Sequence, residues 1–365
     1  MIIRSLRLRN FRNYESARIE LSDGMNIITG ENAQGKTNLL ESLVYLSLTR
    51  SHRISDEKKL IREDMPFADI ACVLNDEGSE KEIEAIIHRQ GKSLLINRSP
   101  VKKSSDFIGQ LNVVLFAPDD LYLFNDQPRE RRRIMNQEIT KISPQYLLML
   151  NQYQSLLRER NIILKQDKAD ERYLDILDEQ MAEMEAFIVK MRRDFIDTVN
   201  ESMASLYREI SGDDVRASVR YRCCTGDTDD LRASLLEMHR DSRQHDIERR
   251  MTLNGIHRED LVFEKDGISL INTASQGQKR MTMLAFKMAL LRYIQKKTGK
   301  KPVLLLDDVL SELDSVRRQK LLEMVKKPYQ CLITATEIPE EIRKENFREF
   351  RIEKGTVKYV SGGKE

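Results

Sequence analysis

The sequence has no tryptophan, little proline or glycine, and no apolar run long enough to cross a membrane. Its 365 residues include 8 Pro and 15 Gly, which leaves room for long helices. A membrane span needs about 20 consecutive apolar residues, and no segment approaches that length. The N-terminal stretch MIIRSLRLRN alternates apolar and basic residues and lacks the apolar core of a signal peptide. These absences predict a protein without a membrane partner or a secretion signal.

The cysteine content and the net charge further limit the classes of protein that fit this sequence. The four cysteines, Cys72, Cys223, Cys224 and Cys331, show neither C-x-x-C nor any other metal-ligand spacing, which is typical of a reduced cytoplasmic protein. The net charge of +2, from 61 Lys and Arg against 59 Asp and Glu, excludes a histone-like polycation but allows a local basic patch. Hydrophobic residues make up 40% of the chain, enough for a core. The length predicts two or three compact units.

The order of hydrophobic patterns predicts an α/β protein interrupted by a helical segment. Strands are expected at 2–9, 17–21, 25–29, 67–75, 80–88, 91–98, 112–116, 261–263, 268–271, 303–306 and 332–335, and helices at 36–48, 144–166, 170–211 and 276–297. We therefore expect a discontinuous α/β head, residues 1–118 and 251–365, with a helical insertion at 119–250.

The expected insertion is acidic and carries a coiled-coil pattern. Residues 120–250 hold 22 Lys and Arg against 26 Asp and Glu, so the positive excess lies in the head. Apolar residues in the 170–211 segment recur in alternating steps of three and four, which is the seam of a coiled coil. The seam residues are Leu174, Leu177, Met181, Met184, Ile188, Met191 and Phe195. Such a short seam favours a partner helix of the same chain, and another subunit is the alternative.

A phosphate-binding loop follows the strand expected at 25–29. The segment Gly30-Glu31-Asn32-Ala33-Gln34-Gly35-Lys36-Thr37 fits G-x-x-x-x-G-K-[ST] and opens a helix. Its glycines let the backbone wrap an anion, and the helix N-terminus points amide donors at phosphate oxygens. Lys36 is expected on the β- and γ-phosphates and Thr37 on Mg²⁺. The alternative is a glycine-rich turn without a ligand.

Two carboxylates, Asp307 and Asp308, follow the apolar strand expected at 303–306. Acidic groups at the exit of a buried strand are costly unless they serve a cation or a proton transfer. We expect Asp307 to hold Mg²⁺ and Asp308 to polarise the attacking water. An acidic turn that caps the next helix is the alternative.

A third motif, Ser275-Gln276-Gly277-Gln278, opens the helix expected at 276–297. Serine is a good N-cap, and Gly277 would let a phosphate approach the amides. Taken alone, this motif indicates only helix capping.

The order of these motifs resembles the ATP-binding-cassette heads of SMC-like proteins and, within them, the RecF family. The resemblance covers about residues 1–340. It rests on Asn10-Phe11-Arg12-Asn13-Tyr14, on the loop through Asn38, on Phe116-Ala117-Pro118-Asp119-Asp120-Leu121 before Arg131, Arg132 and Arg133, on Gly255-Ile256-His257-Arg258-Glu259-Asp260-Leu261, on the Ser275 motif, and on 304–314.

The resemblance implies a function and further site residues. RecF-like proteins bind ATP and Mg²⁺, form an ATP-dependent homodimer, hydrolyse ATP slowly and bind gapped or single-stranded DNA. They help RecO and RecR load the recombinase, and they support the SOS response and replication restart in the bacterial cytoplasm and nucleoid. By position, Ser275, Gly277 and Gln278 would reach a neighbour's ATP. Asp314 would contact the other subunit, and Arg12 would touch the nucleotide.

The chain departs from the cassette pattern in several places. Asp308 stands where a glutamate is usual, and its shorter side chain predicts slow turnover. Ala117-Pro118 stands where a glutamine is expected, so that role is unassigned. Thr334 or Thr336 replaces the switch histidine and cannot carry a proton as imidazole does.

Other readings remain open beside this one. An ATP-binding DNA clamp with negligible hydrolysis, or another SMC-like ATPase, would use the same motifs. A transporter subunit would need the missing glutamine and histidine, and a GTP switch would need an N-K-x-D sequence, which the chain lacks. Arg131, Arg132 and Arg133 are candidate DNA contacts, with ion pairing at a helix start as the alternative.

Overall fold

The protein consists of two compact units, each assembled from distant parts of the chain. The structure is a computed structural model that describes residues 1–360 apart from 77, 126, 227 and 327. Unit 1 comprises Met1–Leu121, Ser205–Asp214 and Arg280–Glu365, and unit 2 comprises Tyr122–Ala204 and Val215–Lys279. No helix in the described ranges is both long and apolar enough to cross a membrane.

Unit 1 carries the α/β architecture. Its strands are β1 (Ile2–Phe11), β2 (Tyr14–Glu20), β3 (Met25–Thr29), β4 (Phe67–Asp76), β5 (Ser79–His88), β6 (Gly91–Ile96), β7 (Ser99–Pro100), β8 (Val113–Phe116), β12 (Val303–Asp307), β13 (Cys331–Thr334), β14 (Phe347–Glu353) and β15 (Thr356–Val360). Its helices are α1 (Lys36–Leu48), α2 (Ser104–Phe107) and α8 (Ser315–Val325), with short 3₁₀ turns at Glu57–Leu60, Leu310–Glu312 and Ile342–Lys344.

The mixed sheet of unit 1 has the order β15-β14-β3-β13-β12-β8. Strands β14, β3, β13, β12 and β8 pair in parallel, and β15 pairs antiparallel to β14. Strand β13 lies between β3 and β12, and its residue Thr334 is opposite Ile28 on one side and Asp307 on the other. Because parallel strands end at the same sheet edge, this order places the end of β3 close to the end of β12.

Helix α1 is buried in the core of unit 1. An antiparallel sheet of order β2-β1-β4-β5-β6-β7 supplies one part of that core, and the mixed sheet supplies another. Leu39, Leu40 and Leu43 of α1 are fully buried with residues of both sheets. The loop that precedes α1 is therefore attached to a rigid support.

Unit 2 is mainly helical, with one small sheet. Its elements are α3 (Pro128–Ile142), α4 (Pro144–Ile163), β9 (Ala217–Arg222), α6 (Leu231–Arg249), β10 (Asp260–Lys265) and β11 (Ile268–Ser269). Three elements continue from one unit into the other: the 3₁₀ turn Pro118–Phe124, α5 (Glu171–Ser211) and α7 (Gln276–Thr298). The small sheet has the order β11-β10-β9.

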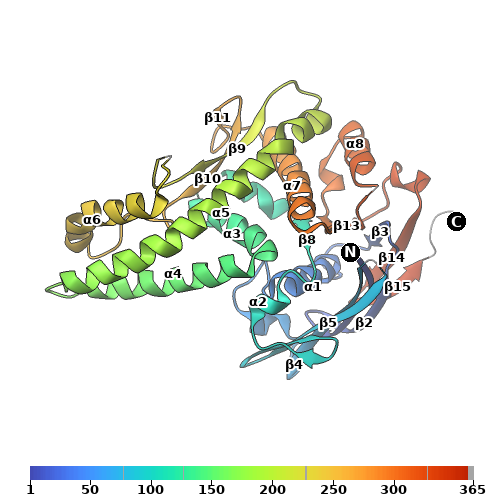
Figure 1. Ribbon diagram of the computed structural model, residues 1–365. Coiled ribbons are helices and arrows are strands. Elements are labelled where there is room, and N and C mark those ends of the chain that lie inside the picture. Colours follow the sequence, from blue (N-terminus) through green and yellow to red (C-terminus); the bar gives the residue numbers. More distant parts are fainter. Residues whose placement is uncertain (77, 126, 227, 327, 361–365) are drawn as a thin grey trace. The chain divides into compact units, whose positions relative to one another are not determined.

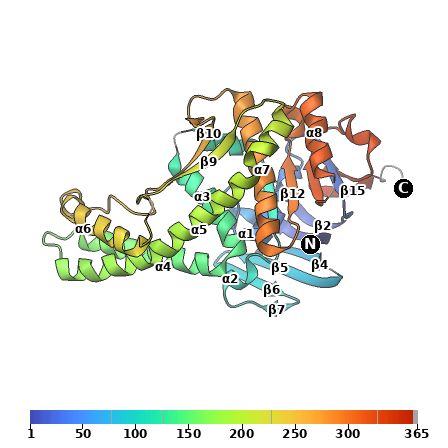
Figure 2. The ribbon, with the colours of Figure 1, turned by 45° about the horizontal axis from the view of Figure 1, so that its top comes forward.

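Five of the seven residues in the apolar seam of α5 are buried within the chain, as the sequence favours. Helix α5 runs alongside α4 in both views (Figures 1 and 2), and Arg160 of α4 bonds Asp178 of α5 at 2.7 Å. The same guanidinium bonds Asp246 of α6 at 2.7 Å, and all three side chains are fully buried. Helix α5 has 41 residues, which is about 60 Å at 1.5 Å per residue.

Most of the expected elements are present, and the α/β fold with a helical part is confirmed. Helix α1 has the expected bounds, whereas no bounds were predicted for β9, β14, β15, α3, α6 and α8, nor for the short β7 and α2. Residues 251–279, which the sequence assigns to the head, lie in unit 2, because β10 pairs with β9 over 217–222. The functional boundaries of head and insertion stay predictions.

Candidate functional site

The phosphate-loop residues connect β3 to α1 in unit 1. Gly35 is the N-cap of α1, with a φ of 117°, and no side chain of the described residues caps this helix. The first amides of α1 are therefore available to an anion. Lys36 is 8% exposed, and its Nζ donates to the carbonyl oxygens of Gly30 at 2.5 Å and Glu31 at 2.9 Å. Burial lowers the pKa of the Lys36 ammonium, and the carboxylates of Asp308 and Asp307 oppose that shift.

Residues of the β1–β2 turn hold the loop in shape. Asn13 donates from Nδ2 to the Gln34 carbonyl at 2.7 Å, and the Tyr14 hydroxyl donates to the Gly35 carbonyl at 2.9 Å. A Cβ on Gly35 would lie 2.6 Å from the Asn13 side-chain amide, so any other residue at this position would displace that side chain. The sequence contained the signal, because Asn13 and Tyr14 belong to one of its motifs, yet no role was predicted for them.

The side chain of Asn38 joins the same set of contacts. Its Nδ2 donates to Asn13 Oδ1 at 2.9 Å, and its Oδ1 accepts from Arg53 at 3.1 Å. Asn13 thus links the start of α1 to the loop, through Asn38 on one side and Gln34 on the other.

Asp307 lies beside the loop, as the sheet order requires. Its Oδ1 accepts from the Thr37 hydroxyl at 3.0 Å and from the Thr334 hydroxyl at 2.8 Å. Burial raises the pKa of the Asp307 carboxyl, while the hydroxyls of Thr334 and Thr37 oppose the rise. A carboxylate and a hydroxyl in contact, next to an anion-binding helix end, are a donor set that suits Mg²⁺ with a phosphate.

Asp308 follows directly and is half-buried. It has a φ of 53°, in the left-handed region, and its amide donates to Thr334 Oγ1 at 2.9 Å. The Thr334 hydroxyl therefore connects the backbone of one acid to the side chain of the other. Of the two threonines proposed for the switch position, Thr334 makes these contacts and Thr336 is exposed.

Arg12 is held by a residue that the sequence analysis missed. Its guanidinium donates to both carboxylate oxygens of Glu41, at 2.9 and 2.8 Å, and to the Lys59 carbonyl at 3.1 Å. Glu41 is fully buried on α1. Burial raises the pKa of Glu41, but hydrogen bonds from Arg12 and Ser51 outweigh it and keep that pKa below its ordinary value.

The Ser275 motif forms the start of α7 in unit 2. Ser275 Oγ accepts from the Gln278 amide at 3.3 Å, and Gln278 Oε1 accepts from the Ser275 amide at 3.0 Å, which is a capping box. Ser275 and Gly277 are exposed, and a Cβ on Gly277 would meet no described heavy atom within 4 Å. The structure therefore contains the helix cap that the motif indicates, and this helix end is open to a ligand.

Asp314 has a local role in unit 1. Its carboxylate caps α8 by accepting from the Arg317 amide at 2.9 Å, and it pairs with the Arg317 guanidinium at 2.7 Å. The amide bond is the main reason that its pKa lies below the ordinary value. About half of its side chain is exposed.

The arginines predicted to contact DNA differ in accessibility. Arg131 is 1% exposed and forms a two-bond pair with Asp260, each bond 2.8 Å long, so its guanidinium is not a surface group. Arg132 is half-buried and donates to the Glu259 carbonyl at 2.6 Å. Only Arg133, within the described part of the chain, keeps the exposed position that the prediction requires among these three. The burial of Arg131 was not predicted, because its ion-pair partner Asp260 is distant in sequence.

Known proteins match this chain along almost its whole length. The family described as RecF/RecN/SMC N terminal domain matches residues 2–356. A protein of Listeria welshimeri, named DNA replication and repair protein RecF, is 39% identical over 98% of this chain and 100% of its own. A protein of the same name from Geobacillus sp. is 38% identical over 93% of each chain.

Solved structures agree with these matches. The structure described as the recombination mediator protein RecF-ATP in RecFOR pathway is 31% identical, with a TM-score of 0.90 over 99% of this chain and 98% of that one. An Smc head domain from Pyrococcus furiosus with an extended coiled coil is 18% identical, with a TM-score of 0.56 over 98% and 96% of the two chains. The latter likeness concerns the fold alone.

Proposed function

This chain belongs to the RecF family of SMC-like ATPases, and from that premise we propose that it is an ATP-dependent DNA-binding protein of recombinational repair. The observation that carries the proposal is the contact of Thr37 with Asp307 beside the uncapped N-terminus of α1. Contact between a P-loop threonine and a strand-end acid supports a site for ATP with Mg²⁺.

We assign the nucleotide-binding roles residue by residue. The amides from Gly30 to Thr37 would surround the β-phosphate, and Lys36 would exchange its two carbonyl partners for phosphate oxygens. Thr37 and Asp307 would hold Mg²⁺, which supplies charge neutralisation of the phosphates. Because Glu41 holds the Arg12 guanidinium, Arg12 would contact the nucleotide only through N–H groups that are not bonded to Glu41.

We assign hydrolysis to Asp308, which would orient and polarise the attacking water. Its carboxyl is one methylene shorter than a glutamate, and its backbone is fixed by Thr334. A base with so little reach predicts slow turnover, suited to a switch rather than to fast catalysis. An ATP-binding DNA clamp with negligible hydrolysis is the second candidate, favoured by the same short side chain.

We propose that a second copy of the chain completes the site. The exposed Ser275 and Gly277 end of α7 would meet the ATP of the partner, and Gln278 would keep the cap in place. Asp314 would lie near the contact, beside the start of α8. The relatives' names support a role in DNA replication and repair, and the matching structure's description, which names the RecFOR pathway, supports RecO and RecR as partners.

The first experiment compares Lys36→Arg with Lys59→Arg, an exposed lysine in the same unit. ATP binding, dimerisation and hydrolysis are measured with and without gapped DNA. We expect Lys36→Arg to lose DNA-stimulated hydrolysis and Lys59→Arg to keep it. Full activity and dimerisation in Lys36→Arg would contradict the proposal.

The second experiment separates hydrolysis from assembly. Asp308→Asn should remain a dimer with ATP in sedimentation, because the phosphate contacts are intact, while hydrolysis falls. A monomer under these conditions would contradict the shared site. Binding to gapped, single-stranded and duplex DNA, with ATP, ADP or no nucleotide at two salt concentrations, then tests the DNA preference and counts phosphate contacts.

A further inference from the structure

A cluster of two cysteines and a glutamate lies in unit 2, among residues that the proposed function does not use. Cys223 and Cys224 directly follow β9, and Glu259 directly precedes β10, which pairs with β9. One ligand atom from each residue, the two sulfurs and a carboxylate oxygen, lies within 4.8 Å of the other two. The cysteine spacing alone gave no metal signal, because the third member is distant in sequence.

The two thiols converge on a single oxygen. Glu259 Oε1 accepts from Cys223 Sγ at 3.3 Å and from Cys224 Sγ at 3.1 Å, and also from the Cys224 amide at 3.2 Å. Neighbouring side chains in a regular strand point to opposite faces, but the bend after β9 turns both sulfurs to the same acceptor. The sulfurs and Oε1 therefore already face a common centre.

The other oxygen of the same carboxylate is fixed independently. Glu259 Oε2 accepts from Arg192 Nη1 at 2.5 Å and from the Tyr221 hydroxyl. Partners of this kind orient a ligating carboxylate and are part of most metal sites. Oε1 is thus presented to the sulfurs while Oε2 carries the orienting bonds.

The charges fit a divalent cation. With both thiols deprotonated, the sulfurs and the carboxylate carry three negative charges, of which Arg192 balances one and a divalent cation the other two. We propose that Cys223, Cys224 and Glu259 form a thiolate site for a divalent cation of the zinc class. Binding forms two metal–sulfur bonds and one metal–oxygen bond, and the two thiol protons pass to solvent.

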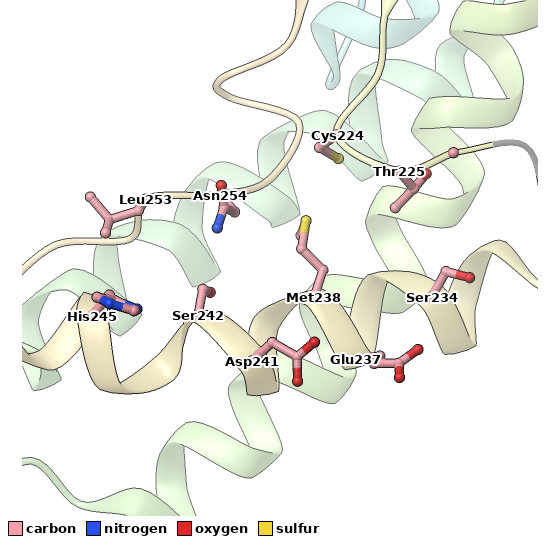
Figure 3. A pocket seen from close by; sticks show the side chains of 11 residues that line it. Cys224, Thr225, Ser234, Glu237, Met238, Asp241, Ser242, His245, Leu253 and Asn254 are labelled. Carbon is pink, nitrogen blue, oxygen red and sulfur yellow. The ribbon is translucent and has the colours of Figure 1, made fainter.

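Each cysteine of the cluster lines a cavity. One, of about 600 Å³, is lined by Cys224 together with residues of α6, and Figure 3 shows the Cys224 thiol and the Met238 thioether projecting into it from opposite walls. The other, of about 800 Å³, is lined by Cys223 and residues of α5 and β9. Three protein ligands leave a fourth coordination position, which a solvent molecule from either cavity could fill.

The site would join the end of β9 to the start of β10. Asp260 pairs with Arg222 at this end of the β9–β10 ladder, so a bound ion would hold the two strands together at the point where they separate. A ligand that binds only the folded state raises stability by mass action. Metal binding would therefore raise the stability of the small sheet in unit 2.

The test titrates the full chain, kept reduced with a phosphine, with Co²⁺ and then Zn²⁺. We expect one equivalent of Co²⁺ per chain with a sulfur-to-metal charge-transfer band, displaced by Zn²⁺. Cys223→Ser and Cys224→Ser should each lose the band, whereas Cys72→Ala and Cys331→Ala, at the other two cysteines, should keep it. Absence of the band, or its persistence in Cys224→Ser, would overturn the site.

A second comparison does not depend on removing a ligand. Tyr221→Phe deletes one orienting bond and should weaken Zn²⁺ binding about 10- to 100-fold. Its matched control is Tyr173→Phe, because Tyr173 also donates to a glutamate, Glu159, in the same unit. Equal affinities in these two variants would contradict the role of Tyr221.

Alkylation of the unaltered chain provides a third measurement. Zn²⁺ should slow alkylation of Cys223 and Cys224 at least 10-fold and leave Cys72 and Cys331 unchanged. Unchanged alkylation, or a Cys223–Cys224 disulfide that forms in place of the metal complex, would overturn the proposal.

Discussion

Arg131 and Arg133 lie two residues apart on α3 and allow a buried arginine to be compared with an exposed one. Arg131 is 1% exposed and donates two bonds to Asp260, with further bonds to the carbonyls of Leu123 at 3.0 Å and Asn125 at 2.6 Å. Arg133 pairs at 2.7 Å with Glu130 on the same helix. We predict that alanine at position 131 damages the fold of unit 2 and that alanine at position 133 does not.

The expected losses in stability for the two substitutions differ about tenfold in free energy. Removal of one partner from a buried ion pair costs about 3–5 kcal/mol, because the other charge stays buried without compensation. An exposed pair on one helix contributes about 0.3–0.5 kcal/mol. At about 1.4 kcal/mol per factor of ten, Arg131→Ala should raise the population of locally opened molecules roughly 140- to 3,700-fold.

Hydrogen exchange is the suitable assay, because the protein has no tryptophan and has two units. Arg131→Ala should lose protection of the amides in α3 and β10, where Asp260 begins the strand. Addition of Asp260→Asn should restore part of that protection, since it removes the unpaired charge. Arg133→Ala should exchange like the unaltered protein.

DNA binding at several salt concentrations completes the comparison. If Arg133 contacts one phosphate, Arg133→Ala should reduce the slope of log K against log salt by about 0.7–0.9. Arg131→Ala should leave the slope unchanged in the molecules that remain folded. Normal protection of α3 and β10 in Arg131→Ala, together with a reduced slope, would refute the structural role of Arg131.

Three further predictions concern other contacts. Thr334→Val removes the hydroxyl that joins Asp307 to Asp308 and should weaken ATP·Mg²⁺ binding about 10- to 100-fold in a nucleotide titration, whereas Thr336→Val, at an exposed position, should not. Asp314→Ala removes the cap of α8 and should destabilise that helix by about 1 kcal/mol in hydrogen exchange; unchanged protection would contradict the capping role. Burial, with lesser repulsion from nearby cationic groups, lowers the pKa of His257 to about 4. The unfolded chain therefore binds more protons than the folded chain between about pH 6.5 and 4. The free energy of unfolding should fall as the pH falls through that range. Thermal unfolding against pH should lose part of this dependence in His257→Gln but not in His245→Gln, at an exposed position; equal dependence in both would count against the assignment.

The sequence predicted the parts of the fold whose signals are local. Helix α1 has the predicted bounds because a glycine-rich turn precedes an apolar run, and α5 follows from its repeating seam. Strand β9 and helix α6 were missed. The β9 sequence ASVRYR is short and mostly polar on one face, and its partner β10 lies about 40 residues later, so its pairing is not visible locally.

The residues of the predicted site also divide into those with a local sequence signal and those without one. Lys36, Thr37 and Asp307 were identified from motif and strand context, and the structure brings them together. Glu41 and the contacts of Thr334 were not identified, because one is a buried acid inside an apolar helix and the other acts across neighbouring strands. Side-chain pairs of this kind depend on which strands are adjacent, which a single sequence does not specify.

By itself the sequence determined the chemistry that unit 1 offers. It specified a glycine-rich turn predicted to bind phosphate, a lysine and threonine at a helix start, and paired acids after a buried strand, because each depends on residues within a few positions of one another. Only the tertiary structure decided what the remaining charged side chains do. It placed Arg131 against Asp260 and brought Cys223 and Cys224 to Glu259, because burial and long-range pairing determine which polar groups find partners.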